Sequence, residues 1–119
     1  MTEADLNYVG SITIDQKLLD KSGIQPFQYV NITNVSNGTF WQTYVMPGKR
    51  GKGDICLNGP PARHFQKGDK IIILAEAWLE PDQLKDLDPI VVIVKDKRNL
   101  VTEIKHLRSI KAKSTGAAK

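Results

Sequence analysis

Short runs of alternating apolar and polar residues, separated by turn residues, make up most of this chain. Isoleucine alternates with threonine at 12–14, and two runs rich in β-branched and aromatic residues, 29–35 and 40–45, flank an Asn-Gly pair. Asn-Gly between two such runs is the strongest short-range signal of a β-hairpin. The pattern therefore predicts a strand at 12–14 and a hairpin formed by the two longer runs.

The second half of the chain repeats this pattern, with further strands predicted at 54–57, 70–75, 90–94 and 100–104. The run at 70–75 is the most apolar of them, so we expect it to be a central strand. Many short strands with tight turns and little helix indicate a mainly β fold built as a small closed barrel.

Helix signals are few. Asp15 is a good N-cap, the leucines at 18–19 fall on one helical face, and Gly23 is a typical stop, so we expect a helix of about two turns there. A second short helix is expected over 80–88, ended by a proline. A single helical turn is expected at 62–65, with a proline near its start.

Composition and charge fit one ordinary domain. The chain has 119 residues, of which 40% are hydrophobic and 25% charged. Five of the 17 basic residues lie after Ile104 with no acidic residue among them, which leaves 12 basic and 13 acidic residues in the rest of the chain. The net charge of +4 therefore belongs to the chain end. We expect one domain over 1–106, a basic, disordered tail over 107–119, and no nucleic-acid partner.

Other features indicate where in the cell the protein is expected and which kinds of chemistry it is not expected to use. No apolar run approaches the roughly 18 residues that a membrane-spanning helix needs, and the polar, acidic start shows no secretory signal, so we expect a cytoplasmic protein without a membrane partner. The single cysteine, Cys56, lies between two apolar residues, where a thiol is usually packed in the core. His64 and His106 lack metal-ligand spacing with it, so no metal site is predicted.

An ordered series of residues resembles the aspartate α-decarboxylases, a pyruvoyl-dependent family. The series keeps a constant spacing from residue 4 to about residue 75 and weakens beyond Trp78. It comprises Ala4-Asp5-Leu6, Tyr8, Gly10-Ser11, Ile14-Asp15, Gly23-Ile24, Asn34-Val35, Asn37-Gly38, Thr43-Tyr44, Arg50-Gly51, Asn58-Gly59, Ala62 and Gly68-Asp69. The resemblance implies a double-psi β-barrel, assembled as a homotetramer with active sites between neighbouring subunits.

The resemblance gives the Gly10-Ser11 pair a chemical meaning. Most Gly-Ser pairs are turn residues, but here the pair matches the site where the family cleaves its own chain. The Ser11 hydroxyl would attack the Gly10 carbonyl, and the serine would become a pyruvoyl group that forms a Schiff base with the substrate amine. That cofactor derives from the chain itself, without a metal or pyridoxal phosphate. Glycine at position 10 offers no Cβ to block the attack.

The family's other site residues carry over by position. Tyr44 matches the proton donor, a role that suits a phenol because it keeps its proton at neutral pH. Thr43 matches a threonine that assists cleavage and contacts substrate, but adjacent strand residues point to opposite faces. We therefore expect a bulge, a strand end or a site shared between subunits there. The remaining candidates for substrate binding are Asn58, Gly59, Pro60, Pro61, Tyr8 and Arg50.

Three departures from the family pattern bear on substrate choice. The family has a strand before the segment matching 2–6 that supplies a lysine, whereas this sequence starts at Met1. Phe40 stands where the family has an arginine that holds a substrate carboxylate; Lys49 or Arg50 would have to compensate. Two prolines at 60–61 replace alanines, which removes two backbone N–H donors.

The function implied is the decarboxylation of aspartate to β-alanine and CO2, a step in pantothenate synthesis. Two alternatives stay open. A larger, less acidic amino acid would suit Phe40 and Trp41. A non-enzymatic barrel would instead bind an anionic partner through the basic residues of the 47–53 loop and the tail. That glycine-rich loop lacks the spacing of a phosphate-binding loop, and an exposed turn is the favoured interpretation.

Overall fold

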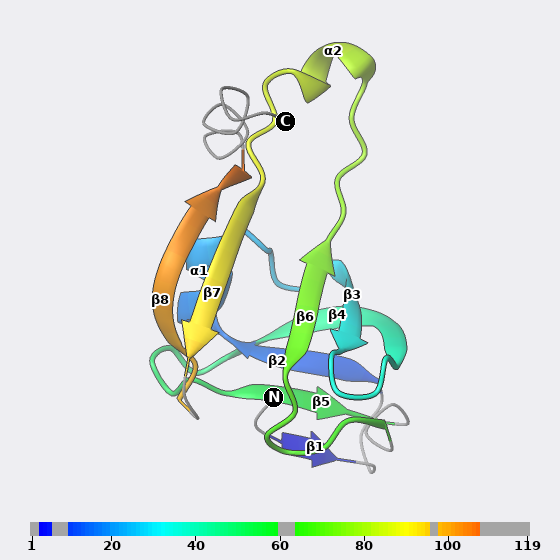
Figure 1. The fold of residues 1–119 in the computed structure, drawn as a ribbon, viewed down its shortest axis with the longest axis vertical. Helices are drawn as coiled ribbons and strands as arrows, with labels where there is room; N and C mark the ends of the chain where they lie inside the picture. Colours follow the sequence, from blue (N-terminus) through cyan, green and yellow to red (C-terminus); the bar gives the residue numbers. More distant parts are fainter. Residues whose placement is uncertain (1–2, 6–9, 60–63, 96–97, 108–119) are drawn as a thin grey trace.

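Strands form most of the regular structure, as the sequence pattern predicted (Figure 1). The computed structural model describes residues 3–5, 10–59, 64–95 and 98–107, with side chains from residue 10 onward. Within this part of the chain the elements are β1 (Glu3–Asp5), β2 (Ser11–Asp15), α1 (Gln16–Ser22), β3 (Tyr29–Asn34), β4 (Phe40–Gly48), β5 (Ile55–Asn58), β6 (Ile71–Ala75), α2 (Pro81–Leu84), β7 (Ile90–Lys95) and β8 (Leu100–His106). The predicted tail lies outside the described residues except for Leu107.

Two sheets organise these strands. Six strands follow the order β1-β5-β2-β4-β3-β6, and β7 pairs with β8 as a separate hairpin. The pairs β1/β5 and β2/β4 are parallel, and β3/β4 is the predicted hairpin. The mainly β, barrel-like fold is confirmed, while the closed double-psi barrel stays a prediction of the resemblance. Because β2 lies between β4 and β5, its first residue, Ser11, has a strand on each side.

The core forms where the inward faces of the sheet meet α1. Its buried hydrophobic residues are Ile12, Ile14, Leu18, Leu19, Val30, Ile32, Val45, Ile55, Leu57 and Phe65. Strand β2 is buried on both faces. Ile12 and Ile14 on one face belong to the core, and Ser11 and Asp15 on the other face are only 5% and 2% exposed. Close packing on both sides of a central strand restricts the movement of its backbone, including that of Ser11 at its start.

The predicted caps define α1. The Asp15 carboxylate accepts a hydrogen bond from the Lys17 N–H at 2.7 Å, and Gly23 ends the helix at φ +82° with its N–H donated to the Leu19 carbonyl. Glycine is favoured at this left-handed position because it has no Cβ. The helix thus begins and ends at the residues that the sequence indicated.

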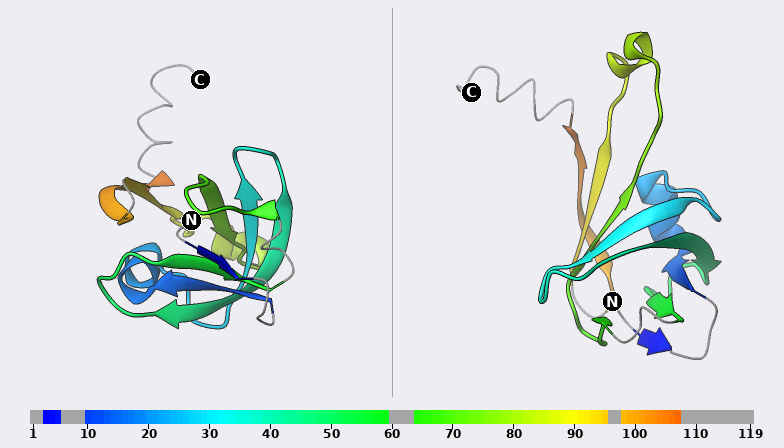
Figure 2. Two further views of the ribbon diagram at one scale, coloured as in Figure 1. Left: turned by 90° about the horizontal axis from the view of Figure 1, so that it is seen from below. Right: turned by 90° about the vertical axis from the view of Figure 1, so that its right-hand side faces the viewer.

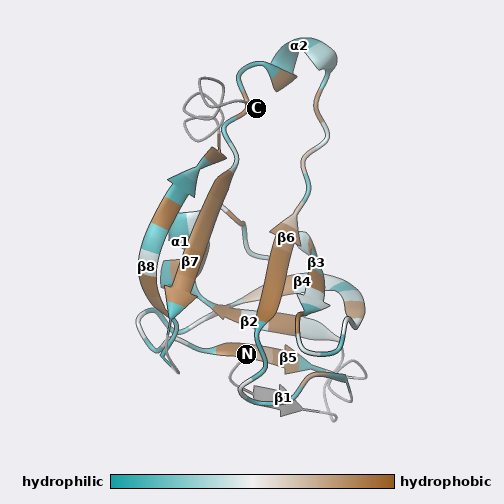
Figure 3. Ribbon diagram, viewed as in Figure 1, coloured by the Kyte–Doolittle hydropathy of each residue, from teal (hydrophilic) through white to brown (hydrophobic). Residues whose placement is uncertain are grey.

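Two predictions about later elements were wrong. The run at 70–75 was expected to be central, but β6 lies at the end of the strand order and pairs with β3 alone in the described sheet. It is apolar along its length (Figure 3), yet only Ile71, Ile73 and Ala75 pack toward the core, and Ile72 and Leu74 are 60% and 59% exposed. An apolar run shows that both faces are apolar, but does not show that both are covered.

The expected helix at 80–88 is a single turn, α2, with a capping box between Glu80 and Gln83. It lies at the tip of an arm between β6 and β7 (Figures 1 and 2). Asp86 and Asp88 follow the turn, and carboxylates are unfavourable at the negative end of a helix dipole. The charge pattern therefore opposes extension of the helix to the proline.

The β7–β8 hairpin docks on the loop between β4 and β5. Asn99 Nδ2 donates to the Gly53 carbonyl at 2.6 Å, and β7 lies against α1. Gly53 has φ +76°, and a Cβ there would overlap the Arg98 backbone. Glycine is thus required here both by the turn and by the neighbouring chain. No helix among the described residues is long and apolar enough to cross a membrane.

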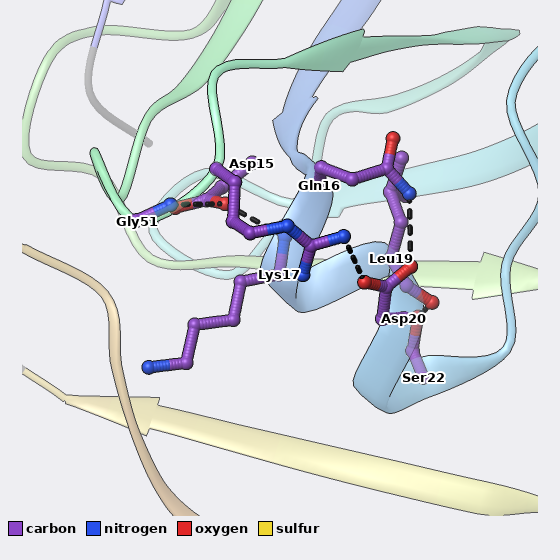
Figure 4. A network of polar contacts seen from close by, with 8 residues as sticks. Asp15, Gln16, Lys17, Leu19, Asp20, Ser22 and Gly51 are labelled. Carbon is purple, nitrogen blue, oxygen red and sulfur yellow. Dashed lines mark hydrogen bonds and ion pairs between the residues drawn. The ribbon is translucent and has the colours of Figure 1, made fainter.

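Asp15 joins this loop to α1 as well as capping the helix (Figure 4). Its carboxylate accepts the backbone N–H groups of Gly51 at 3.0 Å and Gly53 at 2.6 Å, besides that of Lys17. Burial raises the pKa of Asp15, but these three hydrogen bonds and the Lys17 charge outweigh it and hold the pKa below its usual value. The ionised carboxylate is therefore the form that the fold favours.

This network predicts acid sensitivity. A group whose pKa is depressed by folding adds stability above its unfolded pKa, and that stability is lost as the pH falls through the folded value. We expect the free energy of unfolding to decrease once the pH is lower than about 4. The free energy of unfolding of Asp15→Asn at pH 7 should be lower than that of wild type by about 1.5–3 kcal/mol, because charged hydrogen bonds become neutral or unpaired. In urea denaturation at a series of pH values, the stability of this variant should depend less steeply on pH in the acid range. Asp20→Asn, an exposed carboxylate paired with Arg50, is the matched control with a small effect. Equal stabilities of Asp15→Asn and wild type at pH 7 would contradict this assignment.

Candidate active site at the Gly10–Ser11 peptide

Polar side chains from two neighbouring strands gather at the start of β2. The antiparallel register of β2 and β5 places Ser11 opposite Asn58 and Thr13 opposite Cys56. Residues paired in this way point to the same face of the sheet. One face of the β2–β5 pair therefore carries the Ser11 and Thr13 hydroxyls, the Asn58 amide and the Cys56 thiol. The opposite face of the same two strands carries apolar core residues.

Hydrogen bonds join these side chains around the Asn58 amide. Asn58 Nδ2 donates to Ser11 Oγ at 3.2 Å and to Thr13 Oγ1 at 3.3 Å. Cys56 Sγ donates to Asn58 Oδ1 at 3.1 Å. Ser11 and Asn58 are 5% and 8% exposed. The Ser11 hydroxyl is thus nearly shielded from solvent and receives a proton donor at its oxygen, which can stabilise negative charge there.

The other strand beside Ser11 contributes Thr43 and Tyr44. Thr43 is 4% exposed, and its Oγ1 would lie 3.9 Å from a Cβ placed on Gly10. Strand β4 runs parallel to β2 with Ile12 next to Val45, and this register continued by one residue places Tyr44 beside Ser11. Thr43 and Tyr44 do point to opposite faces, yet each lies beside one residue of the Gly10–Ser11 pair. No bulge is needed to bring both to this peptide.

The expectation that a Cβ at position 10 would block the attack by Ser11 is not tested by the strand beside it. A Cβ there would contact Thr43 Oγ1 at an ordinary van der Waals distance of 3.9 Å. The described neighbours therefore leave room for a side chain. Glycine at this position is not explained by crowding from the strand beside it.

Some predicted site residues lie elsewhere or outside the described part. Tyr8, Pro60 and Pro61 fall outside the described residues. Gly59 follows Asn58 as a buried residue with φ +93°, which supports the predicted turn. Phe40, 55% exposed at the start of β4, lines a surface pocket whose described lining has no cationic side chain.

Arg50 is not brought to Ser11 within one chain. It lies in the loop after β4, and the Gly48 end of that strand pairs with Asp15, at the opposite end of β2 from Ser11. There its guanidinium pairs with Asp20 at 2.5 Å. The loop is exposed, as expected, and its Gly51 and Gly53 amides are bonded to Asp15. Neither the arginine nor these amides are available to a carboxylate at Ser11 in the same chain.

Cys56 was interpreted from the sequence as a core residue, and this was wrong. It is half-buried and faces the polar side of β5, while its neighbours Ile55 and Leu57 face the core. Thr13 was likewise not recognised as part of the site. The signal was present in the alternation of strand faces: once Leu57 is assigned to the core, Cys56 and Asn58 must share the other face.

The described residues include no group of three or more His, Cys, Asp or Glu side chains that could hold a metal ion. What the geometry does offer is a buried hydroxyl beside a peptide carbon, with an amide donor on the hydroxyl and a second hydroxyl near the glycine. That arrangement suits an attack by Ser11 on its own chain.

Comparisons with known proteins show which family the chain resembles. The family model described as aspartate decarboxylase matches residues 1–101. The aspartate 1-decarboxylase of Carboxydothermus hydrogenoformans is 52% identical over 105 residues, covering 88% of this chain and 82% of that protein. The aspartate 1-decarboxylase of Sulfurimonas denitrificans is 49% identical over 100 residues, covering 84% and 83%. The aspartate 1-decarboxylase of Salinibacter ruber is 47% identical over 107 residues, covering 90% and 73%.

Proposed function

The chain belongs to the aspartate decarboxylase family, and on this premise we propose that it cleaves itself at Gly10–Ser11 and then converts aspartate to β-alanine and CO2. Supply of β-alanine for pantothenate synthesis in the cytoplasm is part of the same proposal. The observation that carries it is the Ser11 hydroxyl, 5% exposed and held by Asn58 at the start of a central strand. The enzyme is a carboxy-lyase.

The first step rearranges the backbone. Ser11 Oγ forms a bond to the Gly10 carbonyl carbon, the bond from that carbon to the Ser11 nitrogen breaks, and the hydroxyl proton moves to the nitrogen. Asn58 Nδ2, 3.2 Å from Ser11 Oγ, holds the hydroxyl in place in this step and can stabilise the same oxygen when it later leaves as part of the Gly10 carboxylate. Thr43, whose hydroxyl lies beside Gly10, is the candidate donor to the carbonyl oxygen of the tetrahedral intermediate.

The second step breaks the new ester. Elimination across the Cα–Cβ bond of residue 11 releases Gly10 with a free carboxylate, and addition of water to the remaining dehydroalanine releases ammonia and leaves a ketone. The residues fit a group formed here, since the position is buried and has hydroxyl and amide donors around it. The pyruvoyl group so formed supplies the electron-accepting carbonyl for decarboxylation.

The remaining residues handle substrate and proton. Tyr44, half-buried next to Ser11 in the β2–β4 register, is assigned to return a proton to the substrate carbon. Asn58 and Gly59 form the turn that orients the substrate beside it. Pro60 and Pro61 continue this segment as candidate contacts.

We also assign a homotetramer with sites between subunits, by family membership. Support comes from large apolar side chains exposed in the single chain, since monomers rarely expose so many close together. Ile72 and Leu74 of β6, at 60% and 59% exposed, share a sheet with Phe40 of β4, at 55%.

A second candidate substrate is a larger, less acidic amino acid. The observation that favours it is Phe40, which stands where the family has a carboxylate-binding arginine and lines a pocket without a described cation. The loss of one charged hydrogen bond would weaken aspartate binding by about tenfold or more.

Mass spectrometry and CO2 release test the function together. Aged, purified protein should show two chains divided before residue 11, with a ketone on the second that hydrazine reagents trap, and a native mass of four copies of each. Release of CO2 should be fastest with L-aspartate in a panel that includes L-glutamate and aromatic amino acids. Faster release from an aromatic amino acid would support the second candidate. One intact chain with an unmodified serine would leave only a non-enzymatic barrel.

A further inference from the structure

We propose that the free edge of β8 pairs with β8 of a second copy of this chain, antiparallel and centred on Ile104. The inference goes beyond the proposed function, which assigns a homotetramer but no contact to this strand. Among the described strands β8 pairs with β7 alone, and Figure 1 shows no described strand beyond it. A two-stranded sheet is marginally stable in water, and additional strands strengthen it. The backbone and the charges of β8 itself indicate what completes the sheet.

The backbone of β8 presents hydrogen-bonding groups at its free edge. The Leu107 N–H donates to the carbonyl of Pro89, the residue before β7, at 2.9 Å. In an antiparallel ladder, every second residue directs both its N–H and its C=O to the same neighbouring strand. The pairing with β7 is regular from Leu107 back to Glu103, so the odd-numbered residues of this part face β7. Ile104 and His106 therefore direct their backbone groups to the free edge, where another strand can bind them.

Charge selects the register of this pairing. Glu103 and Lys105 lie on either side of Ile104, and both side chains point to the same face of the strand. When two copies of β8 pair about Ile104, Glu103 of each copy lies opposite Lys105 of the other. Pairing centred on Glu103 or on Lys105 would instead place two like charges directly opposite each other, which is unfavourable. The strand is thus complementary to itself in the register about Ile104 and repels itself in the two neighbouring ones.

Both charges remain accessible to a second chain. Lys105 Nζ lies 4.0 Å from Glu103 Oε2 in the same chain, and both side chains are exposed. An exposed ion pair at this distance contributes little to stability, so it does not hold the two groups back from a new partner. A two-fold symmetric pairing makes each contact twice. It would also cover part of Ile104, which is 40% exposed in the single chain.

Charge reversal tests the register. Lys105→Glu and Glu103→Lys each turn two attractive contacts between copies into two repulsive ones. Either variant alone should weaken the association of copies by about tenfold or more, measured by native mass spectrometry and by sedimentation over a dilution series. Lys67→Glu reverses an exposed charge on the turn before β6 and should assemble as wild type does. Assembly of Lys105→Glu and Glu103→Lys at wild-type strength would overturn the inference.

Mixing the two variants separates a contact between copies from the contact within one chain. One variant carries two acidic residues at positions 103 and 105 and the other carries two basic residues there, so every acid again lies opposite a base across the interface. The pair within each chain stays broken. With one variant isotopically labelled, the mixture should regain association as hybrid assemblies. A mixture that associates no more strongly than either variant alone would show that the substitutions act within the chain, and would overturn the inference.

Self-cleavage is a separate measurement on the same samples. A wild-type protein that divides before residue 11 but remains a single copy would overturn this inference and leave the self-processing mechanism in place. A wild-type protein that assembles, and responds to charge reversal as expected, but does not divide would remove the proposed function and support the pairing of β8.

Discussion

Ser11→Ala is expected to leave one uncleaved chain with no measurable decarboxylation. In the proposed mechanism the hydroxyl oxygen attacks Gly10 and then leaves with the Gly10 carboxylate, which opens residue 11 to conversion into the ketone; a methyl group can neither attack nor leave. We expect activity to fall by about 10⁴-fold or more, since no other residue can supply the electrophile. The fold should persist, because Ser11 is held in β2 by backbone pairing to Asn58 and its neighbours.

The matched control is Ser22→Ala, a serine on α1 whose hydroxyl donates to the Leu19 carbonyl at 3.2 Å. It should cleave and turn over as wild type does. Intact mass and CO2 release from aspartate are measured for both variants after equal ageing. Division of the Ser11→Ala chain before residue 11 would disprove the role of this serine and, with it, the self-processing mechanism.

Tyr44→Phe is expected to separate cleavage from catalysis. The substitution removes one oxygen and leaves the ring in its half-buried place on β4, so the precursor should still divide before residue 11. Turnover of the divided enzyme should fall by about 10²–10⁴-fold, the usual contribution of a general acid. The loss should appear in kcat, with KM little changed, because the proton is transferred after substrate has bound.

Tyr29→Phe provides the comparison. Tyr29 pairs directly with Tyr44 across the β3–β4 hairpin, is 62% exposed, and has no assigned role in proton transfer. It should retain turnover close to wild type. If Tyr44→Phe turned over aspartate as fast as Tyr29→Phe, another group would have to return the proton, and the assignment of Tyr44 would be wrong.

Local signals in the sequence predicted the local structure well. Asn-Gly marked the β3–β4 hairpin, and Asp15 and Gly23 marked the ends of α1. These features depend on a few adjacent residues whose backbone preferences are strong, so tertiary contacts reinforce them. The errors occurred where one sequence pattern is compatible with two structures. The apolar strand β6 proved to be an end strand, and the segment between β6 and β7 contains only one turn of helix.

The sequence by itself determined the candidate chemistry: a Gly-Ser pair at the start of a strand, in an ordered series shared with a family that cleaves itself. It also determined which residues alternate between core and opposite face. Only the tertiary structure decided which strands are neighbours. It brings Asn58, 47 positions later in the chain, to the Ser11 hydroxyl and leaves Arg50 at the other end of β2. Strand pairing over such separations depends on the whole core rather than on adjacent residues, and so it has no local signature in the sequence.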